Sequence, residues 1–72
     1  MNYTREQLYD AFNKVCAVNW KDPIDATIDS SDKDIVYEAV IFFTGSVPTF
    51  TPIMGTPYYR VQAVGYYEAV GS

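Results

Sequence analysis

Residues 31–45 read SDKDIVYEAVIFFTG, and the fold class depends on whether this stretch forms a helix or a strand. The helical interpretation places Ser31 at the N-cap and Asp34 three residues later, where negative charge favours a helix N-terminus. Gly45 then provides the C-terminal stop. The strand interpretation rests on the β-branched and aromatic residues of the same stretch. Because both ends carry caps, we expect a helix over Asp34–Thr44, with a strand as the alternative.

The same helical spacing predicts which side of this segment faces the core. The apolar stripe that we expect to be buried consists of Ile35, Ala39, Phe42 and Phe43.

A first helix is predicted near the N-terminus. Thr4 and Gln7 have the spacing of a capping box, in which each side chain bonds the backbone N–H of the other residue. Asp10 and Lys14 have the i,i+4 spacing of a surface ion pair. Apolar residues then follow at helical spacing, at Leu8, Ala11, Phe12 and Val15.

The remaining segments indicate β structure. Residues 24–29 alternate between apolar and polar, which fits a short edge strand or an ordered loop with Ile24 and Ile28 turned inward. Residues 47–53 contain two prolines and suit a sheet edge, and residues 54–57 form a turn. Tyr58–Val70 is predicted to be one long strand or, divided at Gly65, two strands. The fold class is therefore α+β, with two helices packed on a small antiparallel sheet formed by the C-terminal half.

The composition describes one small acidic domain. The 72 residues are 49% hydrophobic and 17% aromatic, and five Lys and Arg against nine Asp and Glu give a net charge of −4. The chain is too apolar to be disordered. Its negative net charge opposes binding to the phosphates of duplex nucleic acid. We expect a single domain over residues 1–72. Because so small a core is marginal, we expect a homo-oligomer, a dimer.

The chain lacks the residues that several classes of protein need for their function. The chain has no histidine and one cysteine, Cys16, which leaves no zinc site, no intramolecular disulfide and no base to activate a nucleophile. It has no glycine-rich phosphate loop and no apolar run near the ~20 residues of a transmembrane helix, and we expect no signal peptide. We therefore expect a non-catalytic cytoplasmic protein with no metal, no cofactor and no membrane contact.

Two residue groups are candidate binding sites. The first combines aromatic rings with one arginine, a combination that can stack on a nucleobase and hold a phosphate. Its members are Tyr58, Arg60, Tyr66, Tyr67 and Trp20, with Tyr59 beside them. The alternative is that these tyrosines pack in a core or a subunit interface while Arg60 lies on the surface.

The second group is acidic and would meet a basic partner. Its members are Asp22, Asp25, Asp29, Asp32 and Asp34. Their spacing lacks the alternate acids and central glycine of a calcium loop. The alternative is a solvated acidic loop with no partner.

The second half of the chain resembles small uncharacterised proteins of bacteriophages and prophages. The resemblance lies in residues 38–46 (EAVIFFTGS), residues 60–63 (RVQA) and residues 65–67 (GYY). It implies a phage-type accessory protein, a class that often inhibits host defence and would act in the host-cell cytoplasm.

Three functions remain open from the sequence. The first is sequestration of a small nucleotide immune signal through the aromatic-arginine group in a homo-oligomer. The second is inhibition of a basic host defence protein, as an anti-CRISPR or nuclease inhibitor, through the acidic segment. The third is a structural or assembly role in a virion.

Overall fold

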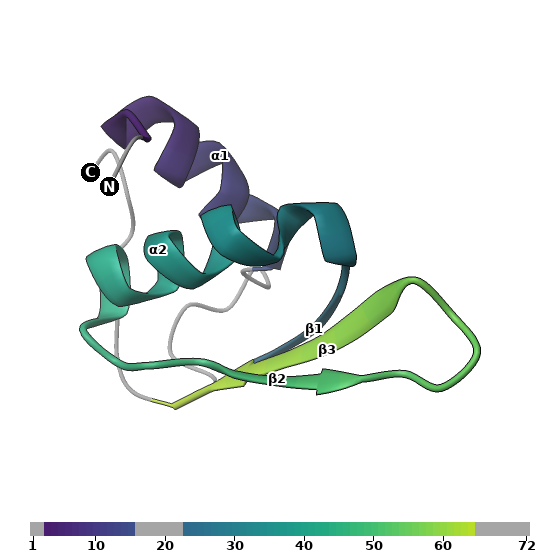
Figure 1. Ribbon diagram of the computed structural model, residues 1–72. Coiled ribbons are helices and arrows are strands. Elements are labelled where there is room, and N and C mark those ends of the chain that lie inside the picture. The colour runs from purple at the N-terminus through teal and green to yellow at the C-terminus, as the bar shows by residue number, and fades with distance from the viewer. Residues whose placement is uncertain (1–2, 16–22, 65–72) are drawn as a thin grey trace.

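The computed structural model describes residues 3–15 and 23–64, and it confirms the α+β fold (Figure 1). Two helices lie over one face of a three-stranded antiparallel sheet. The elements follow in the order α1 (Arg5–Val15), β1 (Ile24–Asp29), the 3₁₀ turn η1 (Ser30–Asp32), α2 (Lys33–Thr44), β2 (Thr49–Pro52) and β3 (Tyr58–Ala63).

The decisive segment is a helix, α2, and its C-terminal cap is the one predicted. Gly45 adopts the left-handed conformation with φ 75°, and its N–H donates to the carbonyl of Ile41 at 2.9 Å. An L side chain rarely adopts this φ, so glycine suits the position. The Thr44 hydroxyl donates to the carbonyl of Val40 at 2.6 Å and satisfies another carbonyl of the last turn.

The predicted N-cap was wrong. Ser31 lies within η1, where its backbone N–H donates to the carboxylate of Asp29 at 3.0 Å. The helix begins at Lys33, and Asp32 occupies the N-cap without a side-chain capping bond. The 3₁₀ turn therefore uses Asp29 to close the chain reversal that leads from β1 into α2.

The buried face of α2 also differs from the predicted stripe. Val36, Ala39 and Val40 are fully buried, whereas Phe42 is 49% exposed. Ile35 and Phe43 are only partly buried at the margin of the core. Of the four residues in the predicted stripe, Ala39 is the one that is fully buried, and Val36 and Val40 occupy the core beside it. Phe42 instead packs edge-on against the ring of Phe43, with centroids 4.9 Å apart.

Helix α1 begins with the predicted capping box. The Thr4 N–H donates to the Gln7 side chain at 2.9 Å, and the Gln7 N–H donates to the Thr4 hydroxyl at 3.1 Å. The predicted Asp10–Lys14 pair is replaced, because the Lys14 ammonium contacts the Asp32 carboxylate at 3.4 Å. This contact links α1 to the start of α2.

The sheet has the order β1-β3-β2, so β3 is hydrogen-bonded on both sides. Residues 24–29 form an edge strand, one of the two options left open, and β2 is the predicted proline-containing edge. An exposed edge on the tyrosine-rich strand would be a natural contact for a second copy, but Tyr58–Ala63 offers no such edge. Both of its edges are already paired within the chain.

The core lies between the helices and the inner face of the sheet. Phe12 and Leu8 from α1 belong to the same buried cluster as Val61 from β3, and each is at most 1% exposed. The remaining core residues come from the same layers, as Ala11, Val15, Ile24, Ile28, Val36, Ala39, Val40 and Ala63. The outer face of the sheet carries the alternate, exposed residues.

The Thr4 side chain caps α1, whereas the Ser31 side chain does not cap α2. We therefore expect alanine substitutions at these two positions to differ in their effect on stability. Thr4→Ala removes a side-chain bond to an otherwise unpaired helical N–H and should lower the free energy of unfolding by about 0.5–2 kcal/mol. Ser31→Ala leaves the backbone bond to Asp29 intact and should cost little. Urea denaturation followed by circular dichroism measures both. A larger loss for Ser31→Ala would contradict this description of the N-termini.

Candidate functional site

The outer face of the sheet presents a line of polar and aromatic side chains along β3. Tyr58, Arg60 and Gln62 are exposed at alternate positions, as a strand requires, and the Tyr58 side chain is 44% exposed. The pairing register adds residues of the edge strands on either side. Asp25 and Thr49 flank Gln62, and Thr27 and Thr51 flank Arg60.

Arg60 is held by a bidentate ion pair with Asp25. Its Nε–H and one Nη2–H donate to the two carboxylate oxygens at 2.9 and 2.7 Å. The two residues are 35 apart in sequence, and the β1–β3 register brings them together diagonally. Because both side chains are about half exposed, the pair contributes little to stability but sets the orientation of the guanidinium.

The ion pair shifts the titration of both partners. The hydrogen bonds from Arg60, and its positive charge, lower the pKa of Asp25 below the ordinary aspartate value. The same bonds raise the pKa of Arg60. Asp25 is therefore ionised and Arg60 charged at neutral pH.

The guanidinium keeps free hydrogen-bonding capacity beyond this pair. An arginine carries five N–H donors in a planar fork, and Asp25 uses two of them. The donors that remain are half exposed, on the same face as the Tyr58 ring. This arrangement can hold an anionic oxygen beside an aromatic surface.

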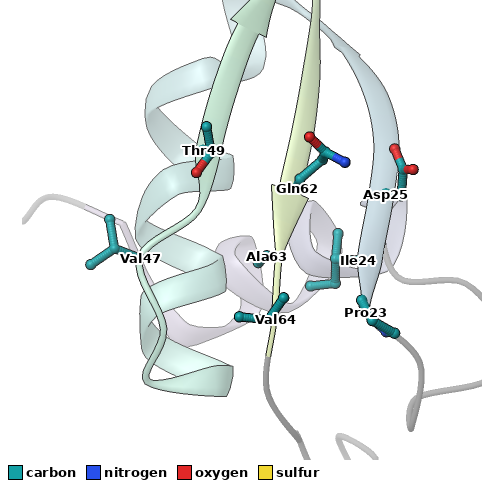
Figure 2. Close-up of a pocket in the computed structure, with 8 residues that line it drawn as sticks. All are labelled: Pro23, Ile24, Asp25, Val47, Thr49, Gln62, Ala63 and Val64. Atoms are coloured by element: carbon teal, nitrogen blue, oxygen red, sulfur yellow. The ribbon is translucent and has the colours of Figure 1, made fainter.

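A groove adjoins this line at the end of the sheet where β1 begins and β3 ends (Figure 2). It has a volume of about 340 Å³. One wall is polar and consists of Asp25, Gln62 and Thr49, which lie side by side across the three strands. The apolar residues are Pro23, Ile24, Val47, Ala63 and Val64.

The structure places two members of the predicted aromatic-arginine group on one face of the sheet. Tyr58 and Arg60 share the exposed outer face, as the alternation predicted. Trp20, Tyr66 and Tyr67 lie outside the described residues. The site therefore rests on Tyr58 and Arg60.

Tyr59 belongs to the opposite face and is not available to an outer-face ligand. Its ring is partly buried against the core. The Lys33 ammonium lies 5.1 Å from the centre of this ring and 5.8 Å from that of Phe50. These cation–π contacts attach the first turn of α2 to the sheet.

Three residues of the acidic segment have partners within the chain. Asp25 pairs with Arg60, and Asp32 contacts Lys14. Asp29 accepts bonds from Ser31, which lower its pKa. Asp34 is exposed in the first turn of α2, and Asp22 lies outside the described residues. Of the four described residues of this segment, three therefore have partners within the chain.

Gln62 and Thr49 are site residues that the sequence analysis did not select. The alternation of side chains along residues 58–64 places Gln62 on the same face as Arg60, so the sequence alone already indicated that these two residues are neighbours on the sheet. Nothing local indicates that Thr49 and Asp25 lie on either side of it. Their proximity comes from the pairing of three strands that are distant in sequence.

Comparison with known proteins does not assign a function to this site. A scan against protein-family models and searches of curated proteins and of solved structures returned no match for this chain. Within residues 3–15 and 23–64, no group of three or more His, Cys, Asp or Glu could hold a metal ion. No helix in that part of the chain has the length and apolar character needed to span a membrane.

The ion pair predicts a specific change in the titration of Asp25. Arg60→Gln should raise the pKa of Asp25 toward its ordinary value of about 3.9, because the hydrogen bonds and positive charge are lost. The pKa of Asp29 should stay low, since its bonds from Ser31 remain. Carboxyl ¹³C NMR titration of both proteins measures the two groups together.

The same pair contributes stability with a defined pH dependence. Because the pKa of Asp25 is lowered by folding, the contribution is full above the ordinary value and is lost as the pH falls through the lowered one. An Asp25 carboxyl that titrates identically with and without Arg60 would show that the pair does not form in solution.

Proposed function

We propose that this protein is a non-catalytic binding protein that sequesters a small phosphate-bearing nucleotide on the outer face of its sheet. The observation that carries the proposal is the arginine that Asp25 orients beside an exposed tyrosine, with N–H donors to spare. The phosphate would accept from Arg60, and a ring of the ligand would stack on Tyr58.

The geometry favours a small ligand over a nucleic-acid strand. A strand needs several cations along its track, whereas Arg60 is the one basic residue among the outer-face positions of the described strands. The net charge of −4 opposes a long polyanion further. A single phosphate group or pyrophosphate needs only one oriented guanidinium.

Asp25 has two opposing effects on such a ligand. It fixes the guanidinium, which lowers the entropy lost on binding. Its negative charge also repels an incoming phosphate, and both charges are half exposed, so solvent screens this repulsion. The affinity for the phosphate therefore depends on the balance between the fixed orientation of the guanidinium and the repulsion by the Asp25 carboxylate.

The resemblance to phage proteins supplies the biological setting of the proposal. A small protein that binds a nucleotide without converting it can remove a signal from solution. We place this activity in the host-cell cytoplasm, against a nucleotide signal of host defence.

We also propose that a second copy covers the open side of the groove and encloses a ligand that is held there. Val47 and Val64 line it and are 66% and 72% exposed, an apolar surface that burial would stabilise. Since β3 has no free edge over Tyr58–Ala63, these side chains replace strand pairing as the proposed contact.

Binding calorimetry tests the nucleotide proposal. ADP-ribose and a cyclic dinucleotide should bind at micromolar protein, and adenosine without phosphate should bind far more weakly. Arg60→Gln should weaken nucleotide binding at least about tenfold, because a charge-assisted bond is lost. Arg5→Gln removes the same charge from an exposed position of α1 and should leave binding unchanged.

Asp25→Asn gives the complementary arm of this experiment. The amide oxygen still accepts from Arg60 while the repulsive charge is gone, so phosphate affinity should rise several-fold. The proposal fails if no tested nucleotide binds, or if Arg60→Gln binds as tightly as the unaltered protein.

Sedimentation velocity over a range of protein concentrations tests the second copy. The unaltered protein should form dimers, and the double variant Val47→Lys, Val64→Lys should be monomeric at the same concentrations. Met54→Lys alters a hairpin residue that is 92% exposed and away from the groove, so it should still form dimers. An unaltered protein that stays monomeric throughout would contradict the proposal.

A further inference from the structure

We infer that the groove beside Arg60 selects the base of the nucleotide, that the base is adenine, and that the Gln62 amide reads it. This inference rests on the proposed function and adds the identity of the base. It depends on the juxtaposition of the groove, the Gln62 side chain and the oriented guanidinium.

The groove has the size and lining of a site for one nucleobase. Its volume of about 340 Å³ lies at the lower end of the range for small-molecule pockets, about 300–1,000 Å³. Pro23, Val47 and Val64 offer apolar surface against which a flat ring can pack. The polar residues are confined to the cross-strand row, where the edge of the ring would lie (Figure 2).

Gln62 is the residue in this row with both a donor and an acceptor on a planar group. Its amide is exposed and forms no hydrogen bond with the described residues of the protein. Adenine presents an acceptor, N7, beside a donor, the 6-amino group, and a glutamine amide matches this pair with two bonds. Hypoxanthine presents two acceptors on the same edge, so the amide oxygen would face the O6 atom.

The neighbouring carboxylate strengthens this preference. Asp25 is ionised and accepts hydrogen bonds only. It lies next to Gln62 across the β1–β3 register. A ligand amino group beside it is favoured, and a ligand carbonyl oxygen is repelled.

The distance to the phosphate site fits a single nucleotide. Gln62 and Arg60 are two residues apart on one strand face, a separation of about 7 Å. A base in the groove therefore leaves its 5′-phosphate within reach of the guanidinium. Tyr58 lies two residues further along the same line, so a ligand with a second ring beyond its phosphates would contact all three side chains.

A matched pair of ligands tests the inference. AMP and IMP differ at position 6 of the base, which carries an amino group in AMP and a carbonyl oxygen in IMP. Calorimetry should give at least about tenfold tighter binding of AMP to the unaltered protein. Gln62→Met has a similar shape without the amide, and it should lose the preference while still binding both nucleotides through Arg60.

A control variant and the contrary outcomes complete the experiment. Thr27→Val alters an exposed outer-face residue in the Arg60 row and should keep the preference. Equal binding of AMP and IMP, or a preference that survives Gln62→Met, overturns the adenine assignment and leaves the nucleotide-binding proposal standing. Failure of both nucleotides to bind overturns the two together. Amide NMR spectra verify that each variant is folded.

Discussion

The pairing of β3 on both sides is the constraint on which the rest of the structure depends. β3 is the last of the described strands, yet it forms the centre of the sheet, and it aligns β1 and β2, which are not paired with each other. Its inner residue Val61 is fully buried beneath the helices. Its outer residues define the candidate site. One strand thus orders the core on one face and the proposed binding surface on the other.

The core explains how so short a chain keeps a defined structure. Small side chains fill the region under α2, and larger ones from α1 close it. The buried side-chain polar atoms of the described residues all have hydrogen-bond partners. Unpaired buried polar groups are costly in a small domain, and this part of the chain avoids them. The exposed outer face can therefore be specialised for binding without cost to the core.

The ion pair between Asp25 and Arg60 connects the fold to the proposed function. Because the pair lies on the surface, it contributes little to stability. Its effect is to orient the Arg60 guanidinium on the face that carries Tyr58 and Gln62. The acidic segment and the aromatic-arginine group are separate in sequence and suggested two alternative binding sites. In the structure they share this contact, and the acidic residue becomes part of the arginine site.

By itself the sequence determined the features that depend on neighbours a few residues apart. The Thr4–Gln7 capping box, the Gly45 stop, the turn at residues 54–57 and the alternation of Tyr58, Arg60 and Gln62 are local hydrogen-bonding and conformational effects. Only the tertiary structure decided the central position of β3, the close approach that buries Val36 and exposes Phe42, and the Asp25–Arg60 pair. These features depend on which distant segments pack together, and composition and spacing leave several such pairings open.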